Sequence, residues 1–132
     1  MAATTCPICR RETVVFQKLF EKHLTKDDIQ GSHGVLIFKN DAAKLCGRHL
    51  GNHENVNLAF YDVENNRWAM RFRRSPQGRH FLTGDWSQFV RGKDLLCEGR
   101  NVTFYSLRCP RCMMNIGYTI GVLKLLGKPI IV

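Results

Sequence analysis

The sequence predicts a single β-rich, barrel-like domain with two short helices. A chain of 132 residues is long enough for one domain with its own core, but too short for two domains of ordinary size. Between Thr13 and Leu107, short extended patterns alternate with turn signals. Helical periodicity occurs at only two places, residues 40–50 and 85–92. Many short strands with two small helices favour a barrel-like, all-β or β-rich domain.

The first part of the chain predicts two strands and then a helix. The segment "TVVFQKLFEK", residues 13–22, has a strand pattern and ends near the polar turn "TKDD". The segment "GVLIF", residues 34–38, is a continuous apolar run, which indicates a buried strand. In "NDAAKLCGRHL", residues 40–50, apolar side chains recur at helical spacing, with Asn40 or Asp41 as the N-cap.

A hairpin is expected at residues 55–73, where "NVNLAFYDV" and "RWAMRFR" flank the turn "ENN". Side chains alternate across a strand, so one face of the second strand carries the apolar residues Trp68, Met70 and Phe72. The opposite face carries a row of arginines, Arg67, Arg71 and Arg73. We expect the apolar face to lie in the core. The arginine row is either an ordinary solvated face or a binding surface.

The rest of the chain predicts one more helix among further strands. "RHFL", residues 79–82, is a short strand. "DWSQFVRG", residues 85–92, is the second helix, with Asp85 as its N-cap and Gln88 at the position that completes a capping box. The last strands are expected at residues 101–107 and within residues 113–132.

The charge balance predicts a polyanionic partner. Lys and Arg number 20 against 11 Asp and Glu, which gives a formal net charge of +9. Such a surface attracts nucleic acid or an anionic membrane. No stretch reaches the roughly 20 apolar residues that a membrane span requires, and no apolar signal-peptide core follows Met1. We therefore expect an intracellular protein whose six cysteines are mostly reduced.

Three successive stretches of the chain carry a family resemblance. They are "LFEKHLTKDDI", "SHGVLIFKNDAAKLC" and "WAMRFRRSPQGRHFLTGDWSQFVRGKDLLCEGRNVTFYSL". Together they resemble the plant B3 DNA-binding domain over residues 16–107, most specifically in "HFLTGDWSQFVRGKDLLCEG". The fragments "HG" at 33–34 and "RHFLT" at 79–83 are most similar to the auxin response factor branch. The resemblance implies a seven-stranded open pseudobarrel with two short α-helices, which grips the major groove of double-stranded DNA with two arms.

The resemblance also implies which residues meet DNA. It places His33 and Gly34 in the first arm, and it places Arg79 in the second arm as a reader of bases. A guanidinium can form two hydrogen bonds with the O6 and N7 edge of guanine, so an arginine at the rim of a loop is suited to base reading. Helix N-termini and basic side chains favour phosphates. Contacts near the DNA backbone are accordingly expected from Arg71, Arg73, Arg74, Thr83 and Ser87.

These expectations describe a nuclear DNA-binding domain that acts in transcription, with no small-molecule substrate and no membrane partner. The sequence has no Gly-rich phosphate loop, nucleophile elbow or HExxH motif, so we do not expect an enzyme. We divide the chain into an N-terminal arm, a B3-like domain, and a C-terminal segment whose final strand packs on the barrel. The boundaries are residues 1–12, 13–108 and 109–132.

Two C-x-x-C pairs, Cys6 with Cys9 and Cys109 with Cys112, flank the barrel segment. Four thiolates in two such pairs suit one tetrahedral, structural Zn²⁺ ion. About 100 residues separate the pairs, so this site requires that the chain ends meet in space. Unligated thiols, disulfides and a redox motif are the alternatives. The rival function is a zinc-clasped protein-interaction module with only non-specific affinity for DNA.

Overall fold

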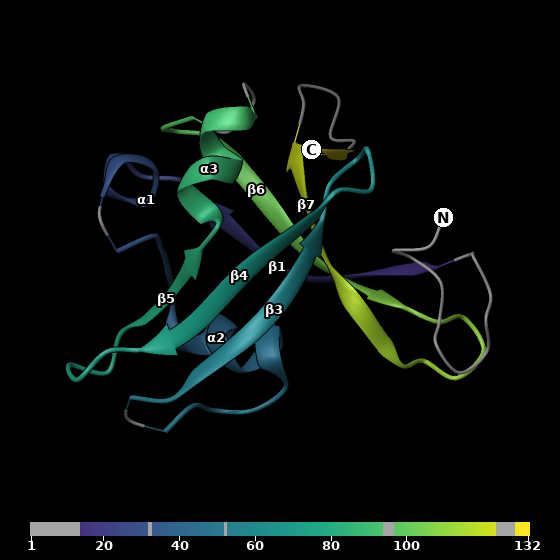
Figure 1. Cartoon of the computed structure of the whole chain (residues 1–132), viewed down its shortest axis with the longest axis horizontal. Coiled ribbons are helices and arrows are strands. Elements are labelled where there is room, and N and C mark those ends of the chain that lie inside the picture. The colour runs from purple at the N-terminus through teal and green to yellow at the C-terminus, as the bar shows by residue number, and fades with distance from the viewer. Residues whose placement is uncertain (1–13, 32, 52, 94–96, 124–128) are drawn as a thin grey trace.

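The computed structural model describes residues 14–31, 33–51, 53–93, 97–123 and 129–132 of the chain. Within these ranges, the chain forms eight strands and three short helices (Figure 1). The elements are, in order, β1 (Val15–His23), α1 (Lys26–Gln30), β2 (Val35–Ile37), α2 (Lys39–Cys46), β3 (Asn55–Tyr61), β4 (Arg67–Arg74), β5 (His80–Gly84), α3 (Trp86–Gly92), β6 (Asn101–Arg108), β7 (Asn115–Leu123) and β8 (Pro129–Ile131).

Seven strands form one continuous hydrogen-bonded path in the order β1-β6-β7-β3-β4-β5-β2, and β8 pairs with β7. The pairings are antiparallel except that of β3 with β7, which is parallel and joins Phe60 to Tyr118. The predicted β-rich architecture of seven main strands is therefore confirmed. Strand β7 is hydrogen-bonded to β6 on one side and to β3 on the other, so this part of the C-terminal segment belongs to the sheet itself.

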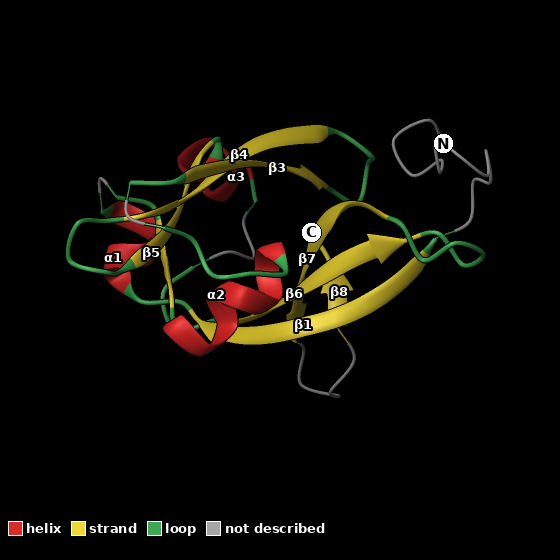
Figure 2. Ribbon diagram, turned by 90° about the horizontal axis from the view of Figure 1, so that it is seen from below, coloured by secondary structure: helices red, strands yellow, loops and turns green. Residues whose placement is uncertain are grey.

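The core lies between the two sides of the strongly curved sheet. In Figure 2, β3 and β4 lie on one side of the molecule, and β1, β6 and β8 lie on the other. Phe60 of β3 meets Phe104 of β6 edge to face, with ring centroids 6.0 Å apart, and Phe104 stacks on Phe20 of β1 at 4.7 Å. Burial of apolar surface is the dominant favourable contribution to folding, and large aromatic side chains bury much of it.

A short helix, α1, stands where a polar turn was expected. The side chain of Thr25 accepts a hydrogen bond from the Asp28 N–H at 3.3 Å, and Asp28 Oδ2 accepts one from the Thr25 N–H at 2.9 Å. This capping box stabilises one helical turn. The two helices that the sequence predicted, α2 and α3, are also present. Trp86 of α3 donates from Nε1 to the Asp28 carbonyl at 2.7 Å and so ties α3 to α1.

One predicted helix cap is wrong, and the other is correct in position but makes no capping hydrogen bond. Helix α2 has Phe38 as its N-cap residue, so neither Asn40 nor Asp41 caps it. Asp85 does occupy the N-cap position of α3, but its carboxylate makes no capping hydrogen bond. Its Oδ2 atom instead accepts a hydrogen bond from the backbone N–H of Ala69 in β4, at 2.8 Å. Asp85 therefore fixes the start of α3 against the sheet.

No helix within the described residues is long and apolar enough to cross a membrane. The predicted N-terminal arm, residues 1–12, lies outside the described residues.

Candidate nucleic-acid interface

Strand β4 separates an apolar face from a basic one, as its sequence pattern predicts. Met70 and Phe72 are almost completely buried, while Arg71 is exposed and Arg73 is partly exposed on the opposite face. The alternation follows from the pleat of the strand, which sends successive side chains to opposite faces. Among the described residues, no carboxylate forms an ion pair with either arginine, so both keep their charge available for a partner.

The neighbouring strand β5 continues this basic face. Arg71 lies opposite Thr83, and Arg73 lies opposite Phe81. The Thr83 hydroxyl donates a hydrogen bond to the Arg71 carbonyl at 3.3 Å. The guanidinium carbon of Arg73 lies 5.6 Å from the centre of the Phe81 ring, which is within the range of a cation–π interaction. We call the surface formed by Arg71, Arg73, Phe81 and Thr83 the arginine face.

Arg79 lies at the end of the loop that joins β4 to β5, and this loop is firmly closed. The buried Ser75 donates from its backbone N–H to the Arg79 carbonyl at 2.7 Å, and its hydroxyl accepts from the Arg79 N–H at 3.2 Å. The Gly78 N–H donates to the Ser75 carbonyl at 2.9 Å, and the φ angle of +83° at this position favours glycine. The backbone of Arg79 is thus fixed while its side chain remains exposed.

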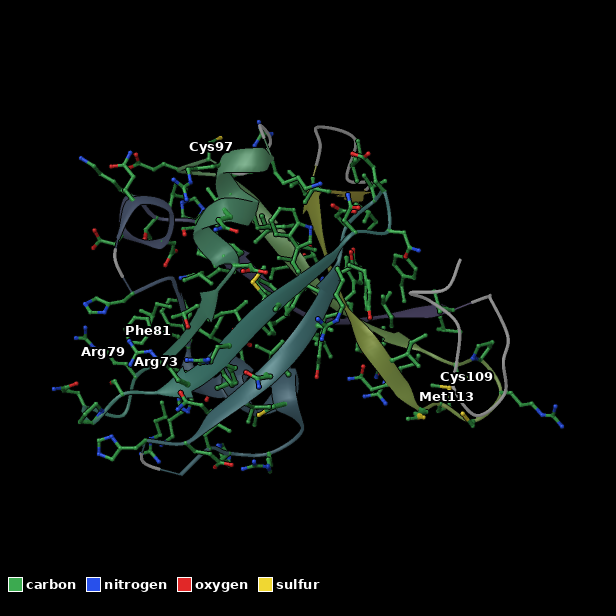
Figure 3. The ribbon with its side chains drawn as sticks, in the orientation of Figure 1. Arg73, Arg79, Phe81, Cys97, Cys109 and Met113 are labelled. Carbon is green, nitrogen blue, oxygen red and sulfur yellow. The ribbon has the colours of Figure 1, made fainter. Side chains whose placement is uncertain are left out.

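Arg73 and Arg79 line one hollow of about 430 Å³, which we call the arginine hollow. Figure 3 shows the two arginines close together with Phe81 at the edge of the molecule. The ring of His33 joins them, with its centre 5.7 Å from that of Phe81. None of the described residues that line the hollow is acidic; they are His33, Arg73, Ser75, Pro76, Gln77, Arg79 and Phe81. The hollow therefore presents three basic side chains around an aromatic ring.

Gly34 allows the segment that carries His33 to approach β5. Its φ angle is +82°, and a Cβ atom added here would lie 2.1 Å from the Leu82 carbonyl oxygen. Only glycine fits this position without a shift of the backbone. Thr83 and the exposed Ser87 of α3 line a smaller neighbouring hollow of about 180 Å³ together with Gly34. The structure thus brings seven of the eight predicted DNA-binding residues to one side of the molecule: His33, Gly34, Arg71, Arg73, Arg79, Thr83 and Ser87.

Arg74, the eighth predicted DNA-binding residue, is directed elsewhere. It follows Arg73 in the strand and therefore points to the opposite face, where its Nη1 atom donates to the Leu50 carbonyl at 3.0 Å. There it lines a separate hollow with the buried His80. Burial, and then the positive charge of Arg74, lower the pKa of His80. The structure does not bring Arg74 together with the arginine face.

The sequence reasoning missed Phe81, which is the aromatic side chain that lines the arginine hollow. It also gave no role to Asn55 and Asn57, which are exposed on β3 directly opposite Arg73 and Arg71. The pattern of "RHFL" contains the signal for Phe81. His80 and Leu82 are buried, so the alternation of the strand turns Phe81 outward. Which residues lie opposite Arg73 depends on the pairing register of β4 with its neighbouring strands, and the local sequence does not specify this register.

The predicted metal ligands are only partly described. Cys6 and Cys9 lie outside the described residues. Cys109 is buried, and Cys112 is exposed in the turn between β6 and β7. Within the described ranges, no group of three or more His, Cys, Asp and Glu residues has the arrangement of a metal site.

Comparison with known proteins gives three kinds of match. The sequence profile of a family described as "B3 DNA binding domain" matches residues 20–116. An AP2/ERF and B3 domain-containing transcription factor from Arabidopsis thaliana is 28% identical over 106 residues, which cover 70% of this chain and 31% of that protein. The chain thus matches about a third of the length of this curated relative.

Two solved structures are similar in fold. The Arabidopsis FUS3–DNA complex superposes with a TM-score of 0.63 at 20% identity, and the match covers 82% of this chain and 98% of that one. The Arabidopsis thaliana LEC2–DNA complex gives a TM-score of 0.55 at 23% identity, covering 71% and 86% of the respective chains. At these identities the likeness concerns the arrangement of the strands and helices.

Proposed function

Because this chain belongs to the family of B3 DNA binding domains, we propose that it binds double-stranded DNA sequence-specifically in the major groove, as part of a nuclear transcription factor. The observation that carries the proposal is the arginine hollow, where Arg73, Arg79 and His33 surround an exposed site that no described acidic residue lines. The two similar structures are complexes with DNA, and the curated relative is a transcription factor. Membership in a DNA-binding family also agrees with the expectation that the chain is not an enzyme.

In this proposal, Arg79 reads bases. Its backbone is fixed by two hydrogen bonds to Ser75, and its side chain is exposed at the rim of the loop. A side chain that starts from a fixed backbone loses less conformational entropy on binding than one on a mobile loop. A guanidinium held in this way can form the two hydrogen bonds that distinguish guanine from the other bases in the major groove.

The arginine face holds the phosphate backbone in the same proposal. Arg71 is exposed in the middle of β4, and Arg73 is held over the Phe81 ring. Contacts with phosphate set the position of the duplex and carry no sequence information by themselves. Ser87 and Thr83, at the smaller hollow, add polar groups on the same side of the molecule. Arg74 has no role in this surface, because it binds the Leu50 carbonyl on the opposite face.

A comparison of two arginine variants tests whether Arg79 reads bases and Arg71 contacts the phosphate backbone. We expect Arg79→Ala to weaken binding to the preferred site by about 1 to 3 kcal/mol and to relax the preference at one base pair. We expect Arg71→Ala to weaken binding to all DNA sequences by a similar factor and to reduce the slope of log K against log salt by about one. The preferred site comes from selection of bound duplexes from a random pool, and the affinities from fluorescence anisotropy over a range of salt concentrations.

Arg111→Ala is the matched control. Arg111 is also an exposed arginine, but it lies in the turn between β6 and β7. Figure 3 shows Cys109 and Met113, which lie on either side of Arg111 in the sequence, at the opposite end of the molecule from Arg73 and Arg79. Its removal lowers the net charge by the same amount and should leave the preferred site unchanged. If selection from the random pool gives no preferred site for the unmutated chain, sequence-specific binding is excluded, and the zinc-clasped interaction module becomes the better hypothesis.

A further inference from the structure

A second basic hollow borders the loop that joins β4 to β5, and Arg74 lines it from the face of β4 opposite to Arg73. Its volume is about 540 Å³, and the loop residue Gln77 lines both this hollow and the arginine hollow. Among the described residues that line it, none is acidic and four are basic: Lys39, His49, Arg74 and His80. We call this cavity the His80 hollow. The function proposed above gives it no role.

Strand register places two of these basic side chains directly opposite each other. Arg74 of β4 pairs with His80 of β5, and residues that pair in this way share one face of the sheet. The His80 side chain is only 5% exposed, and its ring stacks on the ring of Phe72 with centroids 5.8 Å apart. Like charges directly opposite each other destabilise a sheet. An anion bound between Arg74 and a protonated His80 would remove this cost.

The guanidinium of Arg74 keeps unused hydrogen-bonding capacity. Its Nη1 atom donates to the Leu50 carbonyl at 3.0 Å, but its Nε atom is buried and has no hydrogen-bond partner within the described part of the chain. Nε and Nη2 form one edge of the guanidinium, and such an edge can donate to two oxygens of one oxyanion. A Cβ atom added at Gly78 would lie 3.6 Å from Nη2 and 4.0 Å from Nε, so the absence of a side chain there leaves room beside this edge.

The four basic side chains of the hollow come from separate parts of the chain. Lys39 begins α2, His49 follows that helix, and Arg74 and His80 lie on β4 and β5. Burial lowers the pKa of His80, and the positive charges of Arg74, His49 and Lys39 lower it further. No ion pair between described residues joins any of the four to a carboxylate. The hollow therefore has a positive potential, which a bound anion would neutralise.

From these observations we propose that the His80 hollow binds a phosphate group. An ammonium, a guanidinium and two imidazoles supply the donors that a tetrahedral oxyanion needs, with the Gln77 amide beside them.

Two sources of the phosphate group fit the position and size of the hollow. One is the DNA backbone, because a loop in a major groove about 12 Å wide has phosphates on both of its sides. This source rests on the function proposed above. The other is a small phosphorylated molecule, since the volume of the hollow lies within the range of about 300 to 1,000 Å³ that is usual for ligand pockets.

NMR titration of the full chain with inorganic phosphate and with sulfate tests the proposal in the absence of DNA. Sulfate has the same tetrahedral shape and keeps its charge while histidine titrates. We expect both anions to shift the amide signals of Gln77 and Gly78, and sulfate to raise the pKa of the His80 imidazole, because a nearby anion stabilises the protonated ring. Chloride at equal ionic strength should have neither effect. A His80 titration that sulfate leaves unchanged would overturn the proposal.

Lys39→Ala tests the hollow through an exposed side chain, so the variant should keep the fold. We expect it to weaken sulfate binding, measured from the Gly78 amide shift, by about two- to five-fold, as for the loss of one exposed charge contact. Lys44→Ala is the matched control, because Lys44 is also exposed on α2 but does not line the hollow. Equal weakening in both variants would mean that sulfate responds to the net charge of the protein, and this result would also overturn the proposal.

The DNA affinities of the same two variants identify the source of the phosphate. If it belongs to the DNA backbone, Lys39→Ala should weaken binding to all DNA sequences and reduce the salt slope by about one relative to Lys44→Ala. If it belongs to a small molecule, the two variants should bind DNA alike, although sulfate still acts on His80 in the unmutated chain. The sulfate titration contains no DNA, so a failure of site selection from the random pool would refute sequence-specific binding without changing its result.

Discussion

Arg73 and Phe81 are direct cross-strand partners, and the guanidinium of one lies over the ring of the other at 5.6 Å. The same ring contacts His33, with centres 5.7 Å apart. Phe81 therefore supports two of the three basic side chains in the arginine hollow. An aromatic ring of this kind orients charged groups and leaves their charge in place. A carboxylate in the same position would neutralise it.

We predict that Phe81→Ala lowers DNA affinity by about two- to five-fold, because a partly exposed cation–π contact contributes about 0.5 to 1 kcal/mol and its loss leaves Arg73 free to move. Phe81→Tyr keeps the ring and should retain the affinity. Phe16→Ala removes another exposed aromatic side chain, on β1, and serves as the control. Fluorescence anisotropy measures the three dissociation constants, and an equal effect of Phe16→Ala would contradict the role given to Phe81.

We predict that Gly34→Ala destabilises the protein more than Gly47→Ala. Both glycines have positive φ angles, +82° and +76°, so both substitutions introduce backbone strain of about 1 kcal/mol. At Gly34 the new methyl group also meets the Leu82 carbonyl oxygen, whereas nothing lies within 4 Å at Gly47. Urea unfolding should therefore show an additional loss for Gly34→Ala on the order of 1 to 2 kcal/mol. Equal losses of stability in the two variants would show that the segment that carries His33 can move away from the Leu82 carbonyl without destabilising the protein.

We predict a large loss of stability for Asp28→Ala. The Asp28 carboxylate lies 3.3 Å from the Lys22 ammonium, both side chains are at most 4% exposed, and the carboxylate also accepts from the Leu36 N–H at 3.1 Å. Removal of the carboxylate leaves a buried ammonium without its counter-ion, which costs about 3 to 5 kcal/mol.

Glu21→Ala is the matched control for Asp28→Ala. It breaks the exposed ion pair with Lys18 and should leave the free energy of unfolding almost unchanged, because water and salt screen an exposed pair. Urea unfolding of the two variants measures the difference. Similar unfolding midpoints for the two variants would mean that, in Asp28→Ala, the Lys22 ammonium pairs with another group or reaches solvent.

We predict that Asp62 makes stability depend on pH in the acid range. Burial acts to raise the pKa of Asp62, but hydrogen bonds from the Trp68 indole, the Asn66 backbone N–H and the Lys93 ammonium lower it to about 2. The pKa of an unfolded aspartate is about 3.9, so the carboxylate stabilises the fold above about pH 4, and this contribution is lost as the pH falls towards 2. Its size is at most on the order of 2 kcal/mol.

Asp62→Asn tests this assignment. The variant should be less stable than the unmutated chain at pH 7, and the difference should become smaller between pH 4 and 2. Asp27→Asn, at an exposed carboxylate of α1, should leave the pH profile as it is. Urea unfolding at several pH values gives both profiles. A constant difference between Asp62→Asn and the unmutated chain would assign the acid sensitivity to other carboxylates.

Local pattern was enough to predict much of this protein. The alternation in "RWAMRFR" predicts a buried Phe72 and a basic opposite face, and the structure has both. The apolar spacing in "DWSQFVRG" predicts a helix with Trp86 and Phe89 inside, and both side chains are buried. These features depend on the periods of strands and helices, 2.0 and 3.6 residues, and such a period can be recognised within a stretch of about ten residues. The family resemblance added the seven-stranded topology and the side of the molecule that carries His33 and Arg79.

Only the tertiary structure decided which residues meet across the chain. Strand alternation alone turns Arg74 away from Arg73, but only the fold supplies its partner there, the Leu50 carbonyl 24 residues earlier in the sequence. Asp85 was expected to cap its own helix, but it binds the Ala69 N–H of β4. Strand register alone places Phe81 directly opposite Arg73, and Val15 directly opposite Arg108. Register is set by long-range pairing and packing over the whole sheet, and a local sequence pattern cannot specify it.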